Sequence, residues 1–293
     1  MPSVWRKDRM KKVLLAVVAH PDDETFGIGG TLAYYASIGM DVQLICATRG
    51  EAGEVDPAMM EGFASVGELR EHELRCAAKE LGLRQIHFLN YRDSGMLGSP
   101  QNKHKDSLIQ APVEEVARQV AALMRQIRPQ VVLTFDPLGG YKHPDHIAVH
   151  RATVNAFEMA GDEKVKLGDL LPYQPQKLYF HIMPYGLMKT IVKLMPFVGM
   201  DPKKFGRNND IDLTSIMEQN FPIHAKINYR QVTNKRKKAS ACYKSQGGDQ
   251  QSGYLVSWLT RLISVNEHFF RAYPPQEDGN IERDLFEGIK ETG

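Results

Sequence analysis

The sequence has few cysteines and no long hydrophobic run, and each absence excludes a class of protein. Its 293 residues include three cysteines, Cys46, Cys76 and Cys242, and no C-x-x-C pair. So few scattered cysteines are typical of a reducing compartment, and they predict no disulfide framework. No stretch reaches the roughly 18 consecutive apolar residues of a membrane-spanning helix. We therefore expect a cytoplasmic protein that does not span a membrane.

The sequence also lacks a strong net charge and a convincing secretion signal. A formal net charge of +2 gives no whole-protein field that would attract nucleic acid. The basic residues 1–12 precede the apolar run VLLAVVA at 13–19, which superficially looks like a signal peptide. The run is short for that role, and a histidine and acidic residues follow it in place of a cleavage site. We interpret residues 13–19 as a buried strand.

Strand-like and helix-like segments alternate over the first 160 residues. The expected strands are 13–19, 41–48, 85–89 and 130–136, and the expected helices are 28–38, 66–82, 113–127 and about 144–159. Such alternation predicts an α/β fold, a Rossmann-like, mostly parallel sheet with helices on both faces.

The C-terminal part carries weaker patterns. Strands are expected at 176–183 and 222–229, a helix at 234–246, and a segment that starts as a helix at 256–273. We treat residues 1–293 as one domain, with the α/β core at 1–160 and a C-terminal extension at 161–293. The apolar segment 186–200 is expected to pack on the core or on a neighbouring subunit. Its two lysines are too few for a helix that lies on a membrane.

Polar clusters follow four of the expected strands. They occupy residues 20–24, 48–51, 91–94 and 136–146. In open α/β sheets, ligands bind beyond the carboxyl ends of the strands, so these clusters are expected to converge on one rim.

Two His-Pro-Asp motifs predict a metal site on that rim. Catalytic zinc takes three ligands from His, Asp, Glu or Cys and leaves one position to water. His20 and Asp23 are three residues apart at a turn into a helix, so both can face one ion. The second motif, HPDHIAVH, offers further ligands: His143, Asp145, His146 and His150. A helix N-terminus would explain the prolines and acids, but not the histidine that leads both motifs.

At these residues the sequence resembles the LmbE-like, or PIG-L, family of zinc-dependent N-deacetylases. The matching stretches, in order, are AHPDDE (19–24), TRGEAG (48–53), ELREHELRCAAKELGL (68–83), YRDSGM (91–96), HPDHIAVH (143–150) and, more weakly, KKASACYKSQ (237–246). The resemblance covers residues 12–160 well and the C-terminal part loosely. It implies a metal-dependent hydrolase that removes an acetyl group from an amino sugar such as an N-acetylglucosaminide.

The resemblance also implies a role for each matching residue. The metal ligands would be His20, Asp23 and His146, with Zn²⁺ as the ion and Fe²⁺, Co²⁺ or manganese as alternatives. Asp22 would be the general base, and His143 the general acid or the cation that stabilises the oxyanion. Asp145 would orient His143, and Tyr141 would polarise the amide carbonyl. The expected sugar-binding residues are Arg49, Glu51, Arg70 and Asp93.

Two alternatives stay open. The same machinery could serve an amidase that acts on sugar-thiol conjugates. The chain could also be a non-catalytic module that binds a sugar or a nucleotide, although FGIGGTL (26–32) lacks the full glycine fingerprint for a dinucleotide. We expect a small amino-sugar partner, no nucleic acid and no membrane, and the resemblance leaves a homo-oligomer open.

Overall fold

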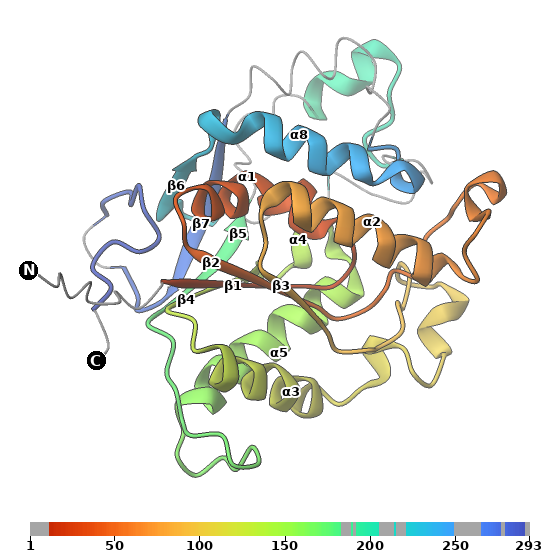
Figure 1. Ribbon diagram of the computed structural model, residues 1–293. Helices are drawn as coiled ribbons and strands as arrows, with labels where there is room; N and C mark the ends of the chain where they lie inside the picture. The colour runs from red at the N-terminus through yellow and green to blue at the C-terminus, as the bar shows by residue number, and fades with distance from the viewer. Residues whose placement is uncertain are drawn as a thin grey trace, which may run out of the picture.

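A seven-stranded sheet with helices on both faces forms the centre of the protein (Figure 1). The computed structural model describes residues 12–182, 189, 192–204, 214, 221–248, 265–276 and 279–290. The strands are β1 (Val13–Val18), β2 (Asp41–Cys46), β3 (Gln85–Phe88), β4 (Val131–Phe135), β5 (Lys177–Ile182), β6 (Ala225–Asn228) and β7 (Asn266–Tyr273). Their order across the sheet is β3-β2-β1-β4-β5-β7-β6.

The first five strands run parallel, and the last two complete the sheet in mixed orientation. β7 pairs antiparallel with both β5 and β6. β1 lies between β2 and β4 and is parallel to each. This arrangement confirms the predicted mostly parallel α/β fold.

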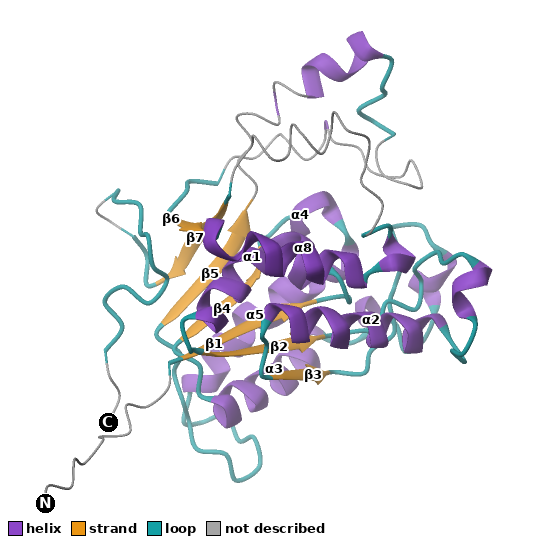
Figure 2. Ribbon diagram, turned by 45° about the horizontal axis from the view of Figure 1, so that its top comes forward, coloured by secondary structure: helices purple, strands orange, loops and turns teal. Residues whose placement is uncertain are grey.

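Helices cover the two faces of the sheet unequally. The longer helices are α1 (Asp23–Ser37), α2 (Val66–Leu81), α3 (Val113–Ile127), α5 (Pro144–Gly161) and α8 (Thr233–Cys242), and α4 (Gly139–Lys142) is a single turn. Short 3-10 turns lie at Pro57–Met60, Pro100–Lys103, Leu108–Gln110, Met195–Val198, Arg230–Val232 and Lys244–Gln246. Figures 1 and 2 show α1, α2 and α8 over one face and α3 and α5 over the other.

Each face of the sheet has its own hydrophobic core, and β1 contributes to both. Leu14 and Ala16 pack under α1 and α2, whereas Leu15 and Val17 pack against α3 and α5. A strand buried on both faces reads as a continuous apolar run, which explains why the sequence of β1 alone predicts it.

The C-terminal segment at 256–273 has a helical pattern only at its start, and that start, residues 256–264, lies outside the described residues. Residues 266–273, where the sequence has no clear pattern, form β7. β7 is hydrogen-bonded on both edges, to β5 and to β6, so pairing with distant segments decides its conformation.

The apolar segment 186–200 is only partly described. Val192 and Met195 are buried, whereas Leu194 and Phe197 are exposed. The described part therefore packs one side on the protein and leaves another open. Among the described residues, no helix is both long and apolar enough to cross a bilayer.

Cys76 and Cys242 form a disulfide, although the few scattered cysteines predicted no disulfide framework. The pair lies 166 residues apart in sequence, and its Cα atoms are 5.8 Å apart because α8 packs on α2. Sequence spacing could not reveal a contact that only this helix packing creates. Cys46 is free and buried. The disulfide also removes one argument for a reducing compartment.

The disulfide should stabilise the fold, because it closes a very long loop in the unfolded chain. Reduction should lower the free energy of unfolding by about 2–4 kcal/mol. Urea unfolding with and without dithiothreitol measures this change. The double variant Cys76→Ser/Cys242→Ser is the control and should not respond to the reductant. Equal unfolding midpoints for the wild type in both conditions would contradict the expectation.

Candidate functional site

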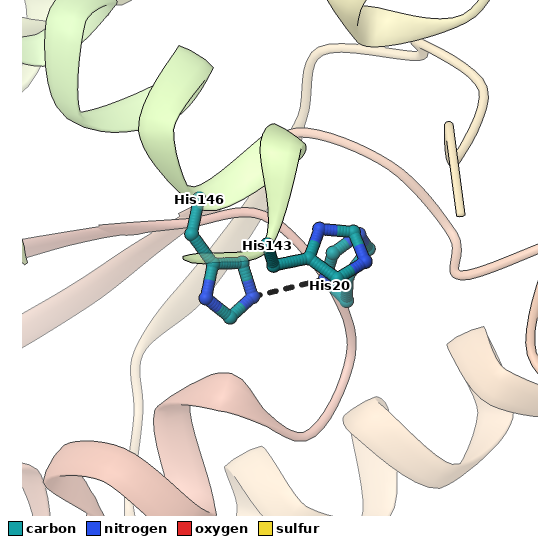
Figure 3. A group of neighbouring side chains, drawn as sticks. All are labelled: His20, His143 and His146. Carbon is teal, nitrogen blue, oxygen red and sulfur yellow. Dashed lines mark hydrogen bonds between the residues drawn. The ribbon is translucent and has the colours of Figure 1, made fainter. Parts of the chain in front are cut away.

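The candidate site lies where the chain leaves β1 and β4 and enters α1 and α5. His20 follows β1, and Asp23 is the first residue of α1. His143 caps the N-terminus of α5, and His146 lies in the first turn of that helix. Figure 3 shows the three histidine side chains gathered at one point, although more than a hundred residues separate the two motifs.

The three predicted metal ligands come together. Nδ1 of His20 lies 3.5 Å from Oδ2 of Asp23 and 3.3 Å from Nε2 of His146. Oδ1 of Asp23 lies 3.1 Å from the same His146 nitrogen. All three side chains are at most 9% exposed. Two imidazoles and one carboxylate at this spacing are a donor set that suits a divalent transition metal.

The other ring nitrogen of His20 contacts a second pair of acids. Nε2 lies 3.1 Å from Oδ2 of Asp145 and 3.4 Å from Oδ1 of Asp93. Burial alone would lower the pKa of His20, but Asp93, Asp145 and Asp23 together raise it well above its usual value. The carboxylates therefore strongly favour positive charge at this point, which fits a cation. A carboxylate behind a ligating histidine is also the usual way to fix its ring.

Asp145 differs from its prediction. Its carboxylate was expected to orient His143, but it accepts hydrogen bonds from His20 and from the backbone N–H of Ser94, at 2.9 Å. Only the backbone N–H of Asp145 reaches His143, donating to Nδ1 at 3.2 Å. The reason is local, because N–H groups in the first turn of a helix have no intrahelical partner and seek the cap residue.

That backbone contact decides the proton position on His143. Because Nδ1 accepts a hydrogen bond, the neutral ring carries its proton on Nε2. Burial, followed by the neighbouring His20 and His146, lowers the pKa of His143 to about 2. In this environment His143 is a neutral hydrogen-bond donor.

Asp22 occupies a strained turn beside the ligands. Its φ is 112°, in the region that residues other than glycine rarely adopt. Arg70 on α2 donates to Oδ2 of Asp22 at 2.9 Å. Burial raises the pKa of the Asp22 carboxyl to about 6, against the opposing effect of Arg70. The carboxyl thus has a pKa in the range that suits a general base near neutral pH.

The predicted sugar-binding residues separate into two groups. Arg70 is 4% exposed and also donates to the carbonyls of Pro21 and Gly50, so its contacts are with the protein. Asp93 is buried beside His20, and its backbone N–H donates to Glu51 at 3.0 Å. Arg49 pairs with Glu71 at 2.5 Å and also binds Asn90. Asp93 therefore lies beside the histidines, and Glu51 is linked to it by a hydrogen bond. None of the described contacts joins Arg49 to these residues.

Tyr141 lies beside the histidines in α4, the single turn between β4 and α5. Its ring centroid is 5.0 Å from that of His146 and 5.9 Å from that of His143. Gly139 permits this approach, since a Cβ there would lie 2.8 Å from Cβ of His146. Gly139 also has a φ of 66°, a conformation that glycine adopts without strain.

Two buried residues near the site were not predicted. Glu24 accepts a hydrogen bond from the backbone N–H of Asp22 at 3.0 Å, and Tyr243 donates to Glu24 at 2.7 Å. The weak match at KKASACYKSQ was the only signal at Tyr243. Glu24 belongs to the polar cluster 20–24 and to the AHPDDE match, but no role was predicted for it.

Comparison with known proteins gives one family and several relatives. The family described as GlcNAc-PI de-N-acetylase (PIG-L) matches residues 15–157. A Thermobifida fusca protein named 1D-myo-inositol 2-acetamido-2-deoxy-alpha-D-glucopyranoside deacetylase is 44% identical over 287 residues, covering 93% of this chain and 98% of that protein.

Solved structures share the fold at low sequence identity. A conserved protein from Thermus thermophilus has a TM-score of 0.59 and 24% identity, over 90% of this chain and 96% of that one. The 4-carboxy-2-hydroxymuconate hydratase GalB of Pseudomonas putida has a TM-score of 0.57 and 18% identity, over 91% and 98%. Since a hydratase has this fold, the fold alone does not decide the reaction.

Asp145→Asn should weaken metal binding, because a neutral amide removes the negative charge that the Asp145 carboxylate places beside Nε2 of His20. Affinity for Zn²⁺ should fall about 10–100-fold, measured by competition with a chromophoric chelator. Asp41→Asn is the matched control: Asp41 is also buried, but it pairs with Arg84 at the start of β2. Unchanged affinity in Asp145→Asn would show that this carboxylate does not hold the ligand.

Proposed function

Because the chain belongs to the PIG-L family of GlcNAc-PI de-N-acetylases, we propose that it is a metal-dependent hydrolase that removes the acetyl group from an amino-sugar nitrogen. The observation that carries the proposal is the packing of His20, Asp23 and His146 beside Asp22. The relative in Thermobifida fusca makes an N-acetylglucosaminide of inositol the first substrate to test.

Zinc is the proposed ion, and His20, Asp23 and His146 are its proposed ligands. When bound there, the ion supplies Lewis acidity that activates water and polarises an amide carbonyl. The nitrogen and oxygen donors also suit Fe²⁺ and Co²⁺, so the choice of zinc is part of the proposal.

Asp22 is the proposed base. A carboxylate with a raised pKa can take a proton from the attacking water and later give it to the leaving amine. Arg70 holds one of its oxygens, which leaves the other for the water. The proton that Asp22 takes from water can thus pass to the leaving amine. The proton balance of the reaction needs no second acid.

His143 and Tyr141 are proposed to stabilise the charge that grows on the carbonyl oxygen. His143 is held with its Nε2–H as donor, and the ring of Tyr141 lies edge-on to that of His143 with 5.9 Å between the centroids. Donors that are already oriented before the reaction give the largest stabilisation of an oxyanion. The resemblance implied a general acid or a cation at His143, and the role proposed here is that of a neutral donor.

Asp93 and Glu51 are the proposed contacts for sugar hydroxyls. A carboxylate can accept from several hydroxyls at once. Both belong to the loops that follow β2 and β3, on the rim that also holds the histidines.

We also propose that residues 1–293 act as one catalytic domain. Support comes from the sheet, in which β5, β6 and β7 of the C-terminal part pair with each other and with β4. The proposed partner is a small glycoside, with no nucleic acid and no membrane, in the cytoplasm.

The test is release of free amine from a panel of N-acetylglucosaminides by zinc-loaded protein. Asp22→Asn should lower kcat by about 10²–10⁴-fold, the usual contribution of a general base. Asp41→Asn is the matched control and should retain the rate. Removal of the metal with a chelator should abolish activity, and added Zn²⁺ should restore it.

Three results would overturn parts of this proposal. Metal binding without release of amine from any glycoside would reject the substrate class. Release only from sugar-thiol amides would favour the amidase alternative. Full activity of Asp22→Asn would reject the assignment of the base.

A further inference from the structure

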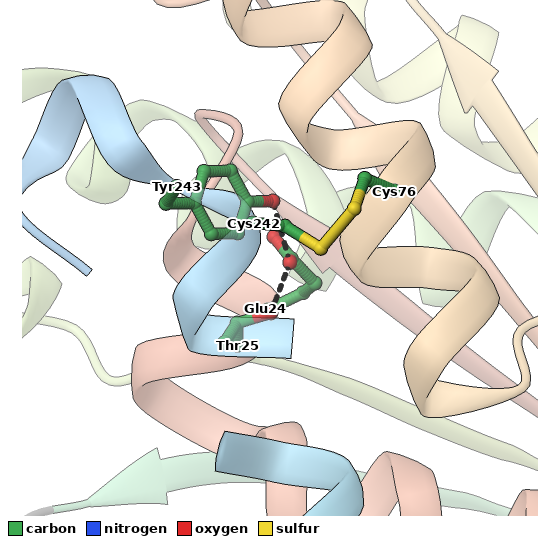
Figure 4. Close-up of a disulfide and its surroundings, with 5 residues drawn as sticks. All are labelled: Glu24, Thr25, Cys76, Cys242 and Tyr243. Carbon is green, nitrogen blue, oxygen red and sulfur yellow. Dashed lines mark hydrogen bonds between the residues drawn. A yellow bond between two sulfur atoms is a disulfide. The ribbon is translucent and has the colours of Figure 1, made fainter. Parts of the chain in front are cut away.

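A chain of buried hydrogen bonds links the end of α8 to Asp22, and Figure 4 shows its part between Tyr243, Glu24 and Thr25. The hydroxyl of Tyr243 donates to Oε1 of Glu24 at 2.7 Å. Oε2 of the same carboxylate accepts from the backbone N–H of Asp22 at 3.0 Å. The hydroxyl of Thr25 also donates to Oε1, at 2.5 Å. Tyr243 and Glu24 are both 0% exposed, so water does not compete for these bonds.

Asp22 needs external support because its backbone conformation is unfavourable. A non-glycine residue with a φ of 112° keeps that conformation only where its surroundings impose it. Two separate contacts do so, since Arg70 holds the side chain and Glu24 holds the backbone N–H. The direction of the Asp22 carboxylate depends on both.

Arg70 and the residue that holds Glu24 come from helices that are joined to each other. Arg70 and Cys76 belong to α2, and Cys76 is linked to Cys242 at the end of α8, directly before Tyr243. Ser245 strengthens this junction by donating through its N–H and its hydroxyl to Glu73 on α2, at 2.8 and 2.6 Å. Tyr243 directly follows Cys242. Its position is therefore fixed relative to α2, whose Arg70 holds the carboxylate of Asp22.

We propose that Tyr243 is a positioning residue for Asp22, acting through the carboxylate of Glu24. The inference rests on the proposed function, in which Asp22 takes the proton from water. Tyr243 does not contact the substrate in this proposal. It keeps Glu24 turned toward the N–H of Asp22, so that the base keeps its direction through the reaction.

The test compares two variants that each remove one buried phenol hydroxyl. Tyr243→Phe keeps the ring and loses the bond to Glu24. Tyr173→Phe is the matched control: Tyr173 is 6% exposed and donates to the carbonyl of Pro129 at 3.0 Å. Pro129 lies just before β4, at the end of the strand opposite to the site.

Tyr243→Phe should lower kcat about 10–100-fold, the range typical of losing a supporting contact behind a metal ligand. KM and zinc content should stay unchanged, because neither the proposed sugar contacts nor the ligands are altered. Hydrogen–deuterium exchange on the zinc-loaded protein should become faster in the peptide that covers residues 20–25, which contains the N–H of Asp22. Tyr173→Phe should change neither kcat nor this exchange.

The proposal is overturned if Tyr243→Phe keeps the wild-type kcat and the wild-type exchange at residues 20–25. It is also overturned if both variants lose kcat equally, since general loosening of the fold would then explain the loss. If the wild type releases no amine but exchange at 20–25 rises only in Tyr243→Phe, the proposed function fails and the positioning role stands.

Discussion

The arrangement of the site depends on His20, whose two ring nitrogens face different partners. Nε2 is held by Asp145, which is itself held by the N–H of Ser94. Nδ1 consequently points toward Asp23 and His146. One buried ring thus joins the turn after β1, the loop after β3 and the start of α5. The parallel pairing of β1 with β2 and β4 brings these segments to the same end of the sheet.

Much of the fold follows from local sequence. β1 is a continuous apolar run, and α3 occupies Val113–Ile127 as predicted, with acids in its first turn and an apolar stripe toward the sheet. The start of α1 was expected at residue 28 but lies at Asp23. The reason is that the positive φ of Asp22 lets the chain turn directly from strand to helix, which no propensity predicts. The C-terminal strands and the disulfide depend on contacts between distant segments, and those leave little trace in local patterns.

In the candidate site, too, local patterns were predictable and contacts between distant segments were not. His20, Asp23 and His146 were predicted because their spacing and their place after strands are visible in the sequence, and the structure brings them together. Their supporting partners were harder to predict. Asp145 lies two residues from His143, yet its carboxylate serves His20, 125 positions away. Arg70 was expected to face sugar, but it turns inward to Asp22. Residue type indicates which interactions a side chain can make, whereas the fold decides which neighbour it contacts.

The position of β7 also bears on how the protein is made. This strand is inserted between β5 and β6, although it is the last of the described strands in sequence order. During synthesis, β6 can join the sheet only after β7 has left the ribosome, because β7 lies between β6 and β5. The edge of β5 that pairs with β7 stays unpaired until the same moment. The N-terminal strands and the two His-Pro-Asp motifs are made long before that point. A nascent chain would therefore carry an exposed edge of β5 beside the strands that position the histidines until β7 pairs with it.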